Sequence, residues 1–319
     1  MLLANQSVGA STRRGRFSIV FGLALLVIGA CSSANAQVLT GIPEPAVYSN
    51  LPNSVPLNLF SQGPEAYGYT ELGDGFTLAE KGTLYTVTVV LSSWACQSGS
   101  WQYPSGPNAC VTTPGATYSM PVTVKIYSVV TGGTSLEGAT GQLAPGTLLT
   151  EATQTFKMPY RPSSNFTNCP ATAAESSGGY YQWYDALTQT CQDGIDFPIT
   201  FSFDSKNVKL PNRIIVTFSF NTTHYGPNPQ GMQACYGTTA GCFYDSLNIS
   251  GGAGAAAFPG PTLAPFVGSV LNVNGIYTSF PNANTALCGV GTAPAETLAL
   301  DASPGCYTGN HPMIAVTAY

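Results

Sequence analysis

Charge is what this sequence has least of. Only 8% of its 319 residues are charged, and ten Lys and Arg against fifteen Asp and Glu give a formal net charge of −5. The basic residues beyond residue 36 are scattered along the chain, whereas phosphate backbones and anionic lipid surfaces are bound by clustered Lys and Arg. We therefore expect no nucleic-acid partner and no electrostatic attachment to a membrane.

The motifs of the common enzyme classes are also missing. The chain has no G-x-S-x-G elbow, no H-E-x-x-H zinc motif, no phosphate-binding glycine loop and no Rossmann fingerprint. It has two histidines, His224 and His311, which lie far apart in the sequence, and His311 before Pro312 is interpreted as a loop residue. No catalytic residue is predicted.

Long apolar runs are absent except at the N-terminus. Three arginines within residues 13–16 precede an apolar run at 17–30, and Ala34-Asn35-Ala36 offers small residues for cleavage. This pattern predicts a signal peptide over residues 1–36, because the run is too short for a comfortable transmembrane helix. Alternatively, Ile28-Gly29-Ala30-Cys31 is a lipobox, and lipidated Cys31 anchors the protein without a membrane span. The protein is expected to be secreted or on the cell surface, or to be an outer-membrane lipoprotein.

Cysteines are present in a number that fits an exported chain. Cys31 belongs to the N-terminal segment, and the eight others indicate disulfides, since no C-x-x-C pair points to zinc. Their spacing favours four local loops, although other pairings are open: Cys96–Cys110, Cys169–Cys191, Cys235–Cys242 and Cys288–Cys306. Each bridge would stabilise the fold by roughly 2–4 kcal/mol.

Apolar and polar residues alternate with a period of two at several places. The alternation is clearest at residues 85–91, 122–127, 197–203 and 214–220, and weaker strands are expected near 66–71, 147–157, 243–249, 270–278 and 312–318. Such alternation is typical of antiparallel strands with one face buried. With Gly and Pro between the strands, the pattern predicts an all-β fold, an antiparallel β-sandwich resembling a jelly roll, with disulfide-stapled loops.

One domain is expected over residues 37–319. The Gly-, Ala- and Pro-rich segment 251–266 has the composition of a flexible connector. The residues after it offer two or three strands and one disulfide, too little for a separate core, so we expect them to complete the same sandwich.

Aromatic residues gather in the loops that the first two disulfides would close. They are Trp94, Trp101 and Tyr103 in or beside one loop, and Tyr181, Trp183 and Tyr184 in the other. Aromatic faces stack on sugar rings, and a stapled loop would hold them in place at low entropic cost. The alternative is that these rings cap the ends of the sandwich.

Two acidic residues beside glycines, Glu71 and Asp74, are candidates for a structural calcium site, because carboxylates and backbone carbonyls at turns bind calcium. The alternatives are a solvated or turn-capping role, or catalysis by paired carboxylates on a glycan. No other cofactor is expected.

Several stretches carry a resemblance, among them TVTVVLSSWACQSGSW, TQTFKMPYRPS and HYGPNPQGMQACY. They are similar to a group of uncharacterised exported proteins of soil bacteria, often β-sandwiches, some with cell-surface sorting tails. The resemblance implies the same fold and location over most of residues 45–319. The group has no established activity, so no functional residue is carried over.

From these patterns we predict a non-catalytic exported protein that binds a polysaccharide or a matrix component. The alternatives are a secreted glycan hydrolase that uses carboxylates, and a structural matrix protein.

Overall fold

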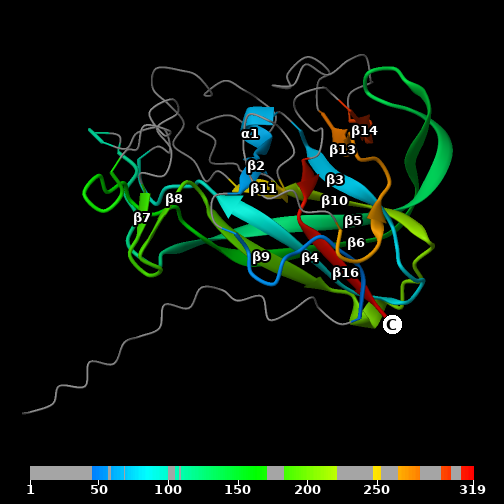
Figure 1. Cartoon of the computed structure of the whole chain (residues 1–319), viewed down its shortest axis with the longest axis horizontal. Helices are drawn as coiled ribbons and strands as arrows, with labels where there is room; N and C mark the ends of the chain where they lie inside the picture. Colours follow the sequence, from blue (N-terminus) through cyan, green and yellow to red (C-terminus); the bar gives the residue numbers. More distant parts are fainter. Residues whose placement is uncertain are drawn as a thin grey trace, which may run out of the picture. The chain divides into compact units, whose positions relative to one another are not determined.

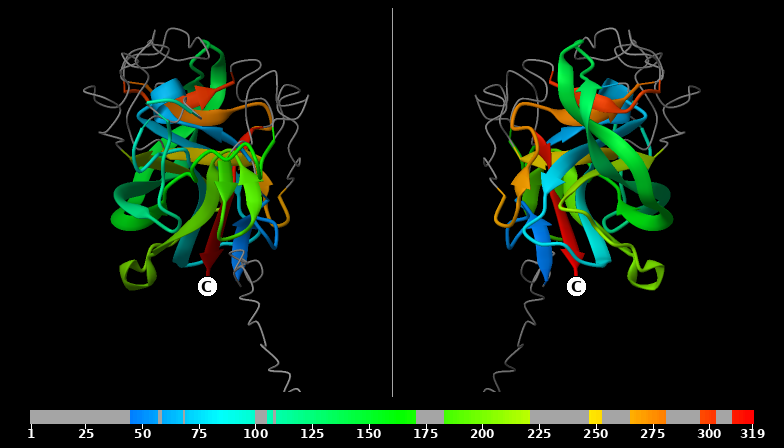
Figure 2. Two further views of the ribbon diagram at one scale, coloured as in Figure 1. Left: turned by 90° about the vertical axis from the view of Figure 1, so that its left-hand side faces the viewer. Right: turned by 90° about the vertical axis from the view of Figure 1, so that its right-hand side faces the viewer.

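The computed structural model describes residues 45–56, 59–67, 69–99, 105–107, 109–170, 183–220, 247–252, 265–280, 296–302 and 310–319. These residues form an antiparallel β-sandwich of two seven-stranded sheets and a short hairpin (Figures 1 and 2). The predicted all-β sandwich is thus confirmed. None of the described helices is both long enough and apolar enough to cross a membrane.

The first sheet is built around β4 (Leu84–Ser93). One edge of β4 pairs with β9 (Ile195–Ser202), and the other pairs with β16 (Ile314–Ala318) and then with β11 (Leu247–Gly252). Three short strands extend this sheet: β1 (Ala46–Ser49) on β16, and β2 (Phe60–Gln62) and β15 (His311–Pro312) on β11.

The second sheet has the order β14-β13-β3-β10-β5-β6, and β12 also pairs with β3. The strand bounds are β3 (Glu71–Thr77), β5 (Thr117–Thr134), β6 (Thr140–Pro159), β10 (Arg213–Phe220), β12 (Ser269–Val270), β13 (Ile276–Ser279) and β14 (Ala299–Asp301). The hairpin of β5 and β6, green in Figure 1, is the longest feature, and its tip reaches β14, where the Leu136 amide donates to the Leu300 carbonyl at 2.8 Å.

Three small elements complete the described chain. The hairpin of β7 (Trp183–Asp185) and β8 (Thr190–Gln192) forms the two-stranded sheet, and a 3-10 turn, η1 (Asp204–Lys206), follows β9. A single helical turn, α1 (Pro64–Tyr67), stands where the sequence predicted the start of a strand near residues 66–71. The strand was predicted too early in the sequence, because it begins only at Glu71. The residues before it start with Pro64, and proline is well suited to the first turn of a helix.

The main core lies between the two sheets. Alternate residues of β10, Ile214, Val216, Phe218 and Phe220, point into it as the alternation predicted. Phe201 of the first sheet packs against Phe156 and Phe218 of the second, with ring centroids 5.0 and 6.3 Å apart. The other face of β10 is buried too, because Ile215 packs with Tyr277 and Leu300 in a satellite cluster. The sequence predicted this face to be polar and solvated.

Replacement of Phe201 tests this packing. Because Phe201 is fully buried and contacts the opposite sheet, Phe201→Ala should lower the free energy of unfolding by about 3–5 kcal/mol. Ser202→Ala, the exposed neighbour on the same strand, should change it by less than about 0.5 kcal/mol. Chemical denaturation of the oxidised protein measures both. Equal losses would contradict the inward orientation of Phe201.

Candidate functional site

Two disulfides close the loops next to the β7–β8 hairpin. Cys96 is bonded to Cys110, and Cys169 is bonded to Cys191 on β8. Both bridges are the local pairs that the spacing favoured. The pairs Cys235–Cys242 and Cys288–Cys306, and Cys31, lie outside the described residues and stay predictions. Disulfides of this kind form in an oxidising compartment.

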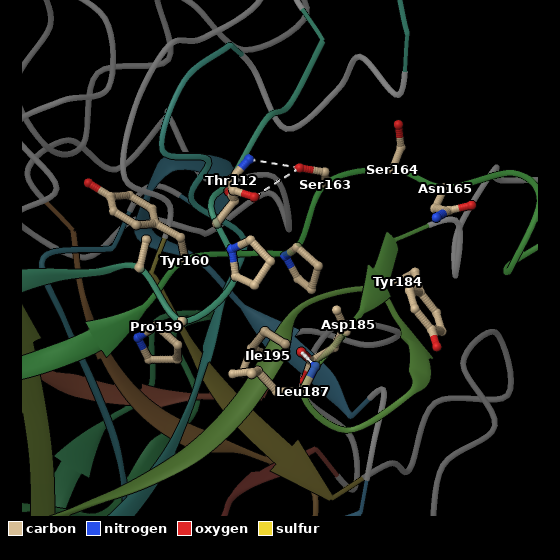
Figure 3. Close-up of a pocket in the computed structure, with 15 residues that line it drawn as sticks. Thr112, Pro159, Tyr160, Ser163, Ser164, Asn165, Tyr184, Asp185, Leu187 and Ile195 are labelled. Atoms are coloured by element: carbon tan, nitrogen blue, oxygen red, sulfur yellow. Dashed lines mark hydrogen bonds between the residues drawn. The ribbon is translucent and has the colours of Figure 1, made fainter. Parts of the chain in front are cut away.

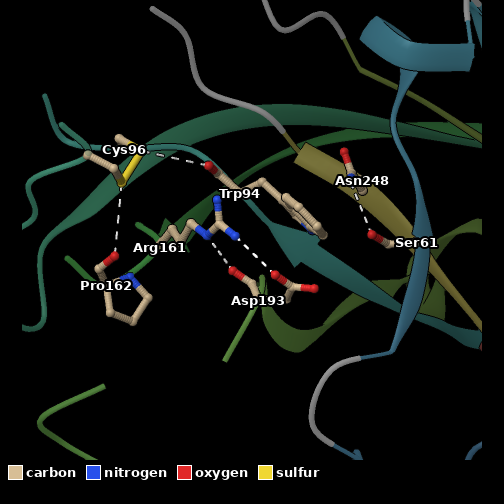
Figure 4. A network of polar contacts seen from close by, with 8 residues as sticks. Ser61, Trp94, Cys96, Arg161, Pro162, Asp193 and Asn248 are labelled. Atoms are coloured by element: carbon tan, nitrogen blue, oxygen red, sulfur yellow. Dashed lines mark hydrogen bonds and ion pairs between the residues drawn. A yellow bond between two sulfur atoms is a disulfide. The ribbon is translucent and has the colours of Figure 1, made fainter. Parts of the chain in front are cut away.

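A buried arginine lies between the two stapled segments. Arg161 is 0% exposed, and its guanidinium carbon lies 3.2 Å from the centre of the Trp183 ring and 4.7 Å from that of Trp94. The guanidinium donates to the backbone carbonyl of Asp193 and, at 3.2 Å, to its carboxylate (Figure 4). The Arg161 amide also donates to the Ala95 carbonyl at 2.8 Å. One side chain therefore connects the ends of β4 and β6 with β7 and the Asp193 turn.

This arrangement buries one of the predicted binding aromatics and half-buries another. Trp183 is 4% exposed and packs on the Cys96–Cys110 bridge, and Trp94 is half-buried beside Arg161. Whether these two rings bind a ligand or cap the sandwich stays a prediction. Trp101, Tyr103 and Tyr181 lie outside the described residues.

Tyr184, the next residue of the hairpin, lines a surface pocket of about 310 Å³. Its walls come from three segments: the loop at 112–116 after the first disulfide, the strap at 159–165 after β6, and the hairpin at 184–187 (Figure 3). We call this pocket the groove. Two tyrosines, Tyr160 and Tyr184, line it together with prolines, hydroxyl side chains and Leu187.

Hydrogen bonds from Ser163 hold the three walls together. The Thr112 amide donates to the Ser163 hydroxyl at 2.8 Å, and that hydroxyl donates back to the Thr112 carbonyl at 3.1 Å (Figure 3). The Tyr184 amide donates to the Ser163 carbonyl at 3.3 Å. With a disulfide beside each outer wall, the shape of the groove is set before any ligand arrives.

The groove has little charge. Asp185 is the one ionisable carboxylate among its lining residues, and it accepts hydrogen bonds from the Leu187 amide at 2.9 Å and the Thr188 hydroxyl at 2.7 Å. Its carboxylate therefore closes the turn of the hairpin. The groove offers aromatic faces and neutral hydroxyl and amide groups to a ligand.

Glu71 and Asp74 do not form one calcium site. Both lie on the regular strand β3, three positions apart, so their side chains point to opposite faces of the sheet. Glu71 accepts from Lys125 at 2.6 Å, from Tyr127 at 3.1 Å and from Thr217. Asp74 faces the core and contacts His311 instead. Within the described residues, no three His, Cys, Asp or Glu side chains gather closely enough to hold a metal ion.

The pair Asp74–His311 joins the two sheets, and the sequence did not predict it. His311 Nδ1 lies 2.7 Å from Asp74 Oδ2, and the ring also hydrogen bonds to the backbone of Val273. Burial lowers the pKa of His311, but the charge and hydrogen bond of Asp74 outweigh it and raise the pKa overall. Burial raises the pKa of Asp74, and His311 offsets only part of this rise. The ring therefore ties β15 to β3.

A third buried carboxyl, Asp196 on β9, fixes the chain around β2 and β11. It accepts from the Leu59 amide at 3.0 Å and the Ser250 hydroxyl at 2.8 Å, and Ser92 adds a further hydrogen bond. Burial nevertheless raises the pKa of Asp196 to about 7. Folding therefore favours the protonated form of this carboxyl relative to the unfolded chain.

The Arg161 cluster is tested by substitution. Arg161→Met removes the charge and leaves Asp193 without its cation, and it should lower the free energy of unfolding by about 3–5 kcal/mol. Arg161→Lys keeps the charge but loses the planar group that contacts both rings, and should also destabilise the protein. Arg213→Met, at an exposed position of β10, is the matched control and should change stability little. If Arg161→Met unfolds at the same denaturant concentration as the control, the cluster does not stabilise the fold.

Asp196 should make stability depend on pH. Because its pKa is about 7 in the folded protein and about 3.8 when unfolded, its contribution is complete below pH 4 and is lost as the pH rises towards 7. A shift of this size corresponds to on the order of 4 kcal/mol. The raised pKa values of Asp74 and His311 also make the folded protein less stable as the pH rises. Between pH 4 and pH 7, the free energy of unfolding should fall less steeply in Asp196→Asn than in the unsubstituted protein. Urea unfolding at each pH measures this dependence. An unchanged slope would contradict the raised pKa of Asp196.

Comparison of the chain with protein-family models, with curated proteins and with solved structures finds no match. The resemblance to exported proteins of soil bacteria stays a prediction, and the groove is the feature on which a function can be argued.

Proposed function

We propose that the protein is an exported, non-catalytic binding protein whose groove holds a polysaccharide or another glycan of the extracellular matrix. The observation that carries the proposal is a preformed groove, with two tyrosines and neutral polar groups, beside two disulfides. The predicted signal peptide would direct the protein to secretion or to the cell surface, and lipidated Cys31 would make it an outer-membrane lipoprotein.

The chemistry of the groove suits a neutral sugar. Tyrosine presents an apolar face for the C–H groups of a pyranose ring and a hydroxyl for hydrogen bonding. Ser164 and Asn165 add polar groups on the strap, and Leu187, 59% exposed, adds an apolar edge on the hairpin. Because the disulfides and Ser163 already order these walls, binding would cost little conformational entropy.

Binding to insoluble polysaccharides tests the proposal. The oxidised exported protein should be depleted from solution by at least one polysaccharide, without release of soluble sugar. Tyr184→Ala removes one aromatic wall of the groove and should weaken binding about tenfold, the equivalent of about 1.4 kcal/mol.

Tyr85→Ala is the matched control, because Tyr85 is 41% exposed, lies near Tyr319 and does not line the groove. It should bind like the unsubstituted protein. Equal binding by Tyr184→Ala would exclude the groove as the site. Release of sugar would favour the glycan hydrolase, and neither depletion nor release would favour the structural matrix protein.

A further inference from the structure

The outer edge of the long strand β6 has no strand partner among the described residues. β6 runs for 20 residues, and within the described part of the chain it pairs only with β5. The side chains of Glu151, Thr153, Thr155 and Lys157 are all exposed. An edge of this length presents a row of backbone N–H and C=O groups that can pair with another strand.

The register with β5 identifies which groups face outward. Glu151 lies opposite Lys125, and Lys206 donates to the Glu151 carbonyl, so this carbonyl points away from β5. Alternate residues of an antiparallel strand direct both backbone groups to the same side. Thr153, Thr155 and Lys157 therefore share the outward orientation of Glu151.

Side-chain contacts agree with this assignment. Residues that face each other without backbone hydrogen bonds have their side chains closest together. The Thr123 and Thr153 hydroxyls are 2.7 Å apart, and Lys157 donates to the Ser119 hydroxyl at 2.9 Å.

We propose that β6 pairs with β6 of a second copy of this chain, antiparallel, about a two-fold axis at Gln154. This register places Glu151 of each copy opposite Lys157 of the other, and Thr153 opposite Thr155. Each facing pair exchanges two backbone hydrogen bonds, and both oppositely charged pairs lie on one face of the joined sheet. Such a pairing is closed and yields a dimer.

Charge selects this register among those with the same outward residues. A two-fold axis at Thr153 would place Glu151 opposite Thr155, and an axis at Thr155 would place Lys157 opposite Thr153; each leaves a charge without its opposite. Lys206 covers the Glu151 carbonyl in the single chain and gives way to the partner's amide in the dimer.

Sedimentation equilibrium of the oxidised exported protein, from micromolar to several hundred micromolar, tests the proposal. The unsubstituted protein should form a dimer as its concentration rises. In Glu151→Lys, positions 151 and 157 that oppose each other across the axis both carry lysine, and in Lys157→Glu both carry glutamate. Because like charges then meet twice in each dimer, each variant should raise the dimer dissociation constant at least about tenfold.

Mixing these two variants is the sharpest measurement. In a heterodimer of Glu151→Lys with Lys157→Glu, every charge meets its opposite, so the mixture should dimerise where neither variant alone does. Thr155→Pro removes an outward N–H without disturbing the pairing with β5, and should give a monomer that melts near the unsubstituted protein. Glu80→Lys and Lys81→Glu, exposed in the turn after β3, are the matched charge controls and should leave dimerisation unchanged.

A protein that stays monomeric throughout this range would overturn the proposal. So would a dimer that tolerates both single charge reversals, or a mixture that associates no better than its components. None of these outcomes depends on glycan binding, so the proposal of a dimer and the proposal of a glycan site in the groove are tested independently.

Discussion

The region of the sandwich that carries the two described disulfides depends on one buried cation. Arg161 has no exposed surface, and a guanidinium removed from water is costly unless its charge and its donors are matched. Trp94 and Trp183 each place a ring face against the guanidinium, and Asp193 provides a carboxylate and a carbonyl. Because these partners come from separate strands and turns, matching the arginine requires all of them to be in place together.

The groove follows from this arrangement. Tyr160 directly precedes Arg161, and Tyr184 directly follows Trp183, so the residues that bury the cation position the two aromatic walls beside it. Trp183 and Tyr184 are neighbours on β7, where side chains alternate between the two faces of the strand, whereas Tyr160 and Arg161 directly follow the end of β6. A single step along the chain therefore leads from the buried cluster to the groove.

Much of the fold could be predicted from local pattern. The alternation in residues 85–91, 197–203 and 214–220 was sufficient to predict β4, β9 and β10, because a strand with one buried face repeats every two residues. The disulfides Cys96–Cys110 and Cys169–Cys191 followed from short spacing, since nearby cysteines need little chain closure. The same alternation failed for Ile215, whose outer face is covered by residues distant in sequence.

The candidate site was only partly predictable. Proximity of aromatics to cysteines pointed to Tyr184, but Tyr160 was missed, although its place between two prolines beside an arginine was a signal. Asp74 was predicted to bind calcium together with Glu71, whereas its contact in the structure is His311, which lies 237 residues away. The sequence by itself determined the main strands, the two disulfides that the structure describes and the scarcity of charge, all of which depend on residues close together in the chain. Only the tertiary structure decided which rings are buried and which carboxyls are paired, because both depend on contacts between distant segments.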